Sequence, residues 1–89
     1  VGAWPGPDNR MYVDNEEGQT ISVVSVSTLE VEATISLGFM PGFAAYNEMH
    51  NELWVTDPDN GKVHYWTKDA TTWTHGGVFN TGAGAHAIA

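Results

Sequence analysis

The sequence contains no cysteine and very few basic residues. Without cysteine, disulfide bonds and thiolate metal sites are excluded, so this chain of 89 residues has no covalent staple for its small core. Lys and Arg together number 3 against 11 Asp and Glu, which gives a formal net charge of −8. This acidic balance argues against nucleic-acid or anionic-membrane binding, because both need basic patches. It suits solubility, salty surroundings or cation binding.

Long hydrophobic runs are also missing. No apolar stretch approaches the ~20 residues of a membrane span, and no charged segment precedes an apolar one as in a signal peptide. The chain begins at Val1 rather than at methionine, so we expect a processed product or a segment of a longer protein.

Apolar and polar residues alternate with a period of two along much of the chain. The alternation is clearest over residues 20–26 and 31–37, and turn-forming sequences such as Asp57-Pro58-Asp59-Asn60-Gly61 separate the apolar runs. A helix could also explain residues 27–36, but their alternation favours a strand. The pattern predicts an all-β fold. The side chains that we expect to be buried are Val13, Val23, Ile35, Val55 and Tyr65.

The sequence repeats itself at an interval of 42 residues. This offset aligns Val13 with Val55, Ile21 with Val63, Val24 with Trp66, Val31 with Trp73, and Ala3-Trp4 with Ala45-Tyr46. The offset grows to 44 near the end, which we attribute to two extra residues around 76–83. A period of about 42–44 residues with four strands per unit is typical of β-propeller blades.

The repeat predicts two four-stranded antiparallel blades that are part of a larger ring. Residues 1–41 form the first blade, residues 42–84 form the second, and residues 85–89 start the inner strand of a further blade. The expected strands are 1–4, 10–14, 20–26 and 31–37 in the first blade, and 42–46, 52–56, 62–67 and 73–79 in the second.

The first blade carries a series of short motifs. They are Tyr12-Val13-Asp14-Asn15, Thr20-Ile21-Ser22-Val23-Val24, and Ala33-Thr34-Ile35 followed by Gly38 and Pro41. This series resembles the YVTN family of β-propeller repeats, and the second blade matches it more loosely. The resemblance implies a propeller in an extracytoplasmic protein, whether secreted, periplasmic or on the cell surface. It transfers no catalytic residue, because the repeat residues are structural.

Four histidines are the candidate metal ligands: His50, His64, His75 and His86. No two of them have the sequence spacing of a zinc pair on one helix or strand, so we expect most to be surface or packing residues. His86 is the exception, because it opens the predicted further inner strand, and inner strands line the central channel. With residues such as Met40 or Asp8 of neighbouring blades, it could hold a metal ion.

Other candidate sites have simpler structural explanations. Asp57, Asp59 and Asn60 resemble the start of a calcium loop, but the twelfth position of an EF-hand would be Lys68, so a tight hairpin is favoured. The aromatic residues fall at matched repeat positions, which indicates core or inter-blade packing. No nucleophile elbow or phosphate-binding loop is present. We therefore predict no catalytic residue and no bound cofactor, apart from a possible metal ion at the central channel.

These observations predict a non-enzymatic binding or surface-structural scaffold. Two blades alone would leave two apolar faces bare, so we expect completion by self-assembly into a ring, with three copies favoured over four, or by the remainder of a longer propeller. The alternative is a fragment or domain of a metal- or cofactor-dependent propeller enzyme with its site at the mouth of the channel.

Overall fold

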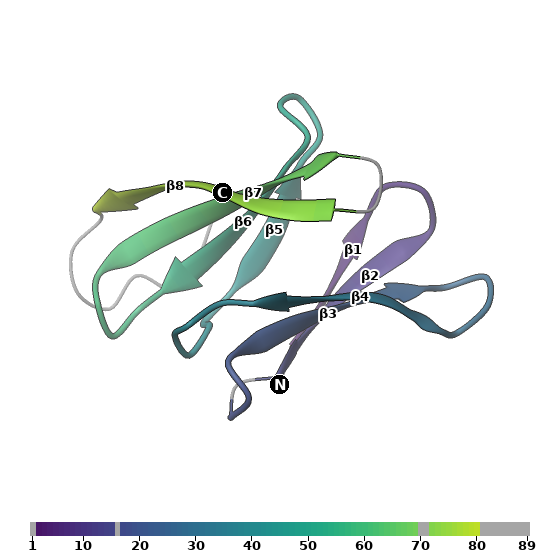
Figure 1. Cartoon of the computed structure of the whole chain (residues 1–89), viewed down its shortest axis with the longest axis horizontal. Coiled ribbons are helices and arrows are strands. Elements are labelled where there is room, and N and C mark those ends of the chain that lie inside the picture. The colour runs from purple at the N-terminus through teal and green to yellow at the C-terminus, as the bar shows by residue number, and fades with distance from the viewer. Residues whose placement is uncertain (1, 16, 70–71, 81–89) are drawn as a thin grey trace.

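The computed structural model describes residues 2–15, 17–69 and 72–80, which form two four-stranded antiparallel sheets (Figure 1). The first sheet contains β1 (Ala3–Gly6), β2 (Arg10–Asn15), β3 (Thr20–Ser25) and β4 (Val31–Ser36). The second contains β5 (Ala44–Asn47), β6 (Glu52–Asp57), β7 (Lys62–Asp69) and β8 (Thr72–Asn80). The all-β prediction is confirmed, and residues 31–36 form a strand rather than a helix. The described ranges include no helix that is long and apolar enough to span a membrane.

Each sheet is a simple meander in which every strand pairs with the next one along the chain. The first strands of the two sheets, β1 and β5, lie against each other, while the later strands extend outward (Figure 1). Short turns make this order possible, because antiparallel neighbours need connections of only a few residues. The arrangement is consistent with two adjacent propeller-like blades.

The strand pairing follows the 42-residue alignment in the middle strands, where both sheets share the same irregularity. In the first sheet the register shifts between Val23 and Val24, and in the second it shifts between Tyr65 and Trp66. These pairs occupy equivalent positions in the repeat. One extra residue in the outer strand bends both sheets at the same place, as β-bulges do.

The alignment of the inner strands is wrong by one residue. Trp4 pairs with Tyr12, whereas the partner of Trp54, the equivalent of Tyr12, is Ala45 rather than Tyr46. The physical reason is turn length. Residues 7–9 connect β1 to β2, but residues 48–51 connect β5 to β6, so the longer turn displaces β5 by one position.

The alignment of the outer strands also needs correction. Val24 pairs with Val31, and the equivalent Trp66 pairs with His75, so His75 rather than Trp73 corresponds to Val31. The two extra residues therefore precede His75 and do not lie around 76–83. They lengthen the hairpin between β7 and β8, which is paired as far as Asp69 and Thr72.

The core lies between the two sheets. Tyr12, Ile21 and Val23 of the first sheet are at most 1% exposed, as are Leu53 and Val55 of the second. The ring of Tyr12 stacks on Tyr46 at 5.9 Å and meets Trp73 edge-on at 5.7 Å, so aromatic contacts cross from one sheet to the other. The remaining buried apolar residues of this cluster are Ile35, Phe39, Ala44 and Trp66.

The burial prediction is right for Val23, Ile35 and Val55 but wrong for Val13 and Tyr65, which are half-buried. The reason is the direction in which each sheet faces. Val55 points into the core between the sheets, but its equivalent Val13 pairs with Ala3 on the opposite, outer face of the first sheet. Of two equivalent residues, one therefore faces the interface between the sheets and the other faces away from it. This interface can bury only the first of the two.

A buried polar residue holds the start of the inner strand in each sheet. Asp14 is 1% exposed, and its carboxylate accepts a hydrogen bond from the backbone N–H of Gly2. The equivalent Thr56 is 0% exposed, and its hydroxyl oxygen accepts a bond from the N–H of Phe43 at 2.8 Å. Both positions thus satisfy backbone donors that lie before the paired part of the strand.

Several turns contain residues with positive φ, and one of these residues, Leu29, is of a type that rarely adopts this conformation. Asn9 and Asn51 adopt φ of 58° and 54°, as asparagine often does. Leu29, in the turn between β3 and β4, adopts φ of 61° although its side chain is 82% exposed and gains little from packing. This left-handed conformation costs most residues about 1–2 kcal/mol.

We predict that Leu29→Asn stabilises the fold by about 0.5–1 kcal/mol, because asparagine tolerates the left-handed region better. Urea unfolding followed by tryptophan fluorescence measures the change. Leu29→Ala is the matched control: it removes the same side chain but keeps an ordinary residue at positive φ, so it should give no gain. Equal effects of both variants would show that the backbone conformation is not the cause.

Burial of Tyr12 makes the stability of the fold sensitive to high pH. Removal from water raises the pKa of the Tyr12 phenol from 10.0 to about 12, and the nearby Tyr46 adds to the increase. Because the folded-state pKa lies above that of the unfolded chain, the neutral ring contributes stability below pH 10, and this contribution is lost as the pH rises towards 12.

We predict that Tyr12→Phe reduces this alkaline loss. From pH 9 to pH 12 the unchanged protein should lose on the order of 2 kcal/mol more stability than the variant, which keeps the ring but cannot ionise. Urea midpoints at one fixed protein concentration measure both. The same pH dependence in the two proteins would contradict the assignment of this loss to Tyr12.

Candidate functional site

Three polar side chains of the second sheet form a continuous hydrogen-bonded chain. Nε2 of His64 lies 3.2 Å from Oδ2 of Asp57, and Nδ1 of the same ring lies 3.1 Å from Nε2 of His75. Asp57 is 3% exposed and His75 is exposed, so the chain runs from a buried carboxylate to a surface imidazole. We call these three residues the His64 cluster.

The strand pairing brings the cluster together. Asp57 ends β6, and the turn that follows returns the chain so that His64 of β7 pairs with Val55 two residues earlier. Residues two apart on a strand share a face, so Asp57 and His64 both face the first sheet. His75 of β8 reaches the same face because it pairs with Trp66, which lies two residues along β7 from His64.

The buried end of the cluster is held in place by the turn. The side-chain amide of Asn60 donates to both carboxylate oxygens of Asp57, at 3.0 and 3.1 Å. The predicted hairpin role of this turn is confirmed, because it joins the paired strands β6 and β7. The acidic residue that resembled a calcium ligand is instead the acceptor that orients His64.

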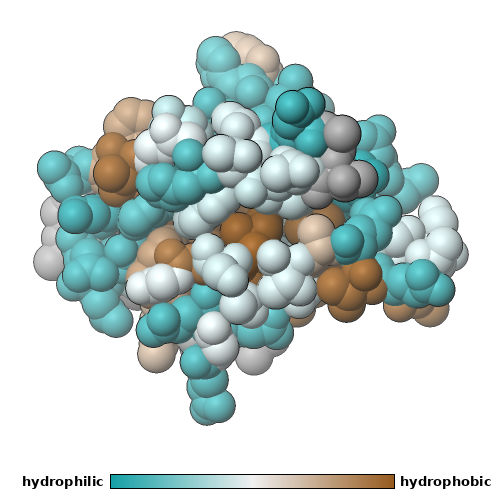
Figure 2. Space-filling view, viewed as in Figure 1, coloured by the Kyte–Doolittle hydropathy of each residue, from teal (hydrophilic) through white to brown (hydrophobic). Residues whose placement is uncertain are grey.

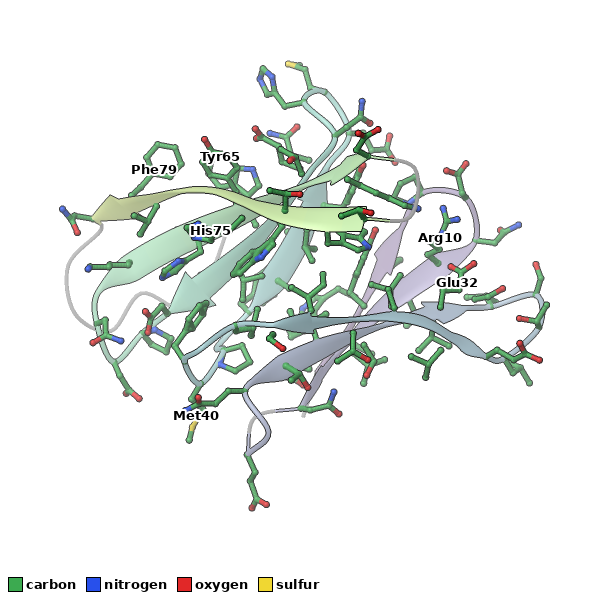
Figure 3. The ribbon with its side chains drawn as sticks, viewed as in Figure 1. Arg10, Glu32, Met40, Tyr65, His75 and Phe79 are labelled. Atoms are coloured by element: carbon green, nitrogen blue, oxygen red, sulfur yellow. The ribbon has the colours of Figure 1, made fainter. Side chains whose placement is uncertain are left out.

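Aromatic rings enclose His64. Phe39, from the connector between the sheets, stacks on the imidazole with centroids 4.3 Å apart, and Trp66 lies 5.9 Å away. The ring of Trp66 also meets His75 edge-on at 5.1 Å. His75 lies on the side of β8 that faces the first sheet, opposite to Tyr65 and Phe79 (Figure 3).

This arrangement can fix a tautomer and present a nitrogen lone pair. The Asp57 carboxylate accepts a hydrogen bond from Nε2–H of His64, which leaves Nδ1 of the ring as an acceptor directed at His75. A nucleophile completing a catalytic triad is not found among the cluster's hydrogen-bonding partners in the described residues. Nor do those residues contain a group of three or more His, Cys, Asp or Glu side chains placed to hold a metal ion.

The other predicted site residues do not gather into a site within the described residues. His86 lies outside them, so the metal site predicted there stays a prediction. His50 is exposed in the turn between β5 and β6. Met40 is 45% exposed in the connector between the sheets, and Asp8 forms an exposed ion pair with Arg10 at 3.3 Å.

Sequence spacing alone missed the pairing of His64 with His75. The two residues are eleven positions apart, and neither zinc-pair spacing applies to a pair on different strands. The strand register brings the two residues together, because Trp66, two residues from His64, pairs with His75. The 42-residue alignment places Trp73 opposite Trp66 instead, so it does not reveal the contact.

A second notable feature is an aromatic cluster on the outer face of the second sheet, formed by Trp54, Tyr65 and Phe79. Trp54 and Phe79 stack with centroids 5.5 Å apart, and Tyr65 stacks on Phe79 at 5.7 Å. The ring of Tyr65 lies over Gly76 and Gly77, where an added Cβ would come within 2.3 and 2.8 Å of it. Figure 3 shows Tyr65 and Phe79 pointing away from the first sheet.

A small hollow lies between the outer strands of the two sheets and is lined by Arg10, Val23, Glu32, Ala33, Lys68 and Trp73. Arg10 forms an ion pair with Glu32 at 2.7 Å, and this bond raises the pKa of the arginine (Figure 3). Lys68 lies over the ring of Trp73 at 5.8 Å. Apolar side chains are visible deeper between the sheets (Figure 2).

Comparisons with family models, characterised proteins and solved structures found no match for this chain. The resemblance to YVTN repeats therefore stays an expectation.

We predict that Asp57→Ala destabilises the fold by about 2 kcal/mol, because it leaves His64 and Asn60 without a charged acceptor in a buried place. Asp59→Ala is the matched control, since Asp59 is exposed in the same turn. Chemical unfolding at pH 7 compares the two variants. If they are equally stable, the buried hydrogen bonds of Asp57 do not hold this turn.

Proposed function

We propose that the chain is a two-blade unit of an extracytoplasmic β-propeller that serves as a binding or surface-structural scaffold and is completed by association with further blades. The observation that carries the proposal is that each sheet has two apolar faces and that the chain covers only one of them.

The outer face of the second sheet repeats the inner face of the first. Tyr12 and Val23 of the first sheet, which pack on the second sheet, correspond to Trp54 and Tyr65 of the outer aromatic cluster. Ile35, also in the core, corresponds by strand register to Phe79, which is 48% exposed. A sheet placed on this outer face would therefore meet apolar residues at the positions that already bury a neighbour within the chain.

The outer face of the first sheet repeats the inner face of the second in the same way. Val13 corresponds to the buried Val55, and Val24 corresponds to the buried Trp66. Val31, which pairs with Val24, is 60% exposed. The two outer faces are thus copies of the two halves of the existing interface.

Complementary but different faces favour head-to-tail association. Such heterologous contacts form rings when the rotation between units closes. An apolar patch of ~400 Å² is worth on the order of 10 kcal/mol before association costs, which rivals the stability of a small domain. Six blades from three chains or eight from four lie within the usual ~4–8 blades, and we favour three copies.

We predict that the 89-residue chain sediments as a particle of about three times 9.6 kDa and not as a folded monomer. Phe79→Asp should abolish association, because it places a charge in the outer aromatic cluster, and Val31→Asp should abolish it from the opposite face. Met49→Asp is the control: Met49 is 86% exposed in the turn between β5 and β6, away from both faces.

Mixing the two interface variants tests the head-to-tail geometry. Each variant keeps one intact face, and the intact faces are complementary, so an equimolar mixture should form a two-chain particle that neither variant forms alone. A compact, folded monomer of the unchanged chain at micromolar concentration would overturn the proposal. Variants that still associate separately, or a mixture that stays monomeric, would overturn head-to-tail assembly.

A further inference from the structure

We propose that His64 and His75 together bind a divalent transition-metal ion, such as Zn²⁺ or Cu²⁺, through Nδ1 of His64 and Nε2 of His75. The site lies on the face of the second sheet that is turned towards the first sheet of the same chain. It is therefore separate from the outer faces, and it does not depend on the proposed assembly.

The distance between the two ring nitrogens suits a shared metal ion. They lie 3.1 Å apart, and the ring centroids are 5.3 Å apart. Two imidazoles on one tetrahedral zinc ion, with Zn–N bonds of about 2.0–2.1 Å, would hold their nitrogens roughly 3.3 Å and their centroids roughly 5 Å apart. The rings need only turn within their present places, and the exposed His75 is free to do so.

Asp57 supplies the partner that metal-binding histidines usually have. A ligating histidine commonly donates its second ring N–H to a carboxylate, which fixes the tautomer and makes the ligating nitrogen more basic. Here Nε2 of His64 faces the buried carboxylate of Asp57 at 3.2 Å, and Nδ1 faces His75. In this tautomer His64 can offer the lone pair of Nδ1 to a metal ion, and His75 can offer Nε2 when its ring proton is on Nδ1.

The metal class follows from the donors. Two neutral imidazole nitrogens suit Zn²⁺, Cu²⁺ and Ni²⁺, whereas Ca²⁺ and Mg²⁺ prefer oxygen ligands. The two nitrogens leave the remaining coordination positions to water or to an external ligand. This open coordination is the feature that distinguishes sites able to bind or activate a small molecule from closed structural sites.

The blade architecture does not require this histidine pair. At the equivalent positions of the first sheet stand Ser22 and Val31, which form a sheet of the same order and with the same irregularity. His75 is exposed and contributes little to the core. The histidine pair is therefore specific to the second sheet.

Calorimetric titration of the metal-free 89-residue chain with ZnCl₂, repeated with CuCl₂, tests the proposal. We expect one ion per chain at this site, and a loss of affinity of more than about tenfold in His75→Ala. Asp57→Asn, which keeps the shape of the side chain but not its charge, should weaken binding by about 10- to 100-fold. Circular dichroism shows whether each variant remains folded, and His75→Ala should, because the residue is exposed.

Two matched histidine variants complete the test. His50→Ala removes an exposed imidazole elsewhere and should leave affinity unchanged, as should His86→Ala, which removes the ligand predicted from the sequence. Absence of zinc and copper binding by the unchanged chain would overturn the proposal. So would binding that survives His75→Ala and disappears in His86→Ala, because the ion would then sit at the other histidine.

Discussion

Packing of the two sheets against each other around Tyr12 is the interaction on which the rest of the structure depends. The chain has neither a disulfide nor a described helix, so a single layer of strands would leave its apolar residues in water. Tyr12 meets Tyr46 and Trp73 across the interface, and Phe39 of the connector fills the space beside Trp66. The same contacts hold the second sheet, in which the pairing of β7 with β8 brings His64 to His75, against the first.

The repeat explains why this interface between two sheets suggests that further interfaces of the same kind form. A strand that is polar on one face needs one neighbour, but these strands carry apolar residues on both faces. Val13 and Tyr65 are therefore only half-buried, although their equivalents Val55 and Val23 are at most 1% exposed. The wrong burial prediction and the argument for further blades thus have one physical origin. Each of the two interacting faces occurs twice in the chain, but the chain brings only one pair of these faces together.

Much of the fold follows from local patterns in the sequence, because strands and turns have short-range signatures. Period-two alternation located the strands, and the 42-residue repeat correctly aligned Tyr12 with Trp54 and Val24 with Trp66. The repeat did not reveal the lengths of the turns, so the predicted alignment was wrong by one residue in β5 and by two residues at His75. The His64 cluster depends on that displaced register. It could not be predicted from histidine spacing, which describes ligands on one strand and not on two.

The same structure suggests how the scaffold and the histidine pair are related. Phe39 is 6% exposed, belongs to the core between the sheets and stacks on His64 at 4.3 Å. If the sheets separated, His64 would lose this ring and the orientation that the packed sheet imposes on it. An ion that binds the paired imidazoles more tightly than the separated ones must then stabilise the packed sheets by the difference in binding free energy. The inter-sheet core and the proposed metal site are therefore coupled through one side chain of the connector.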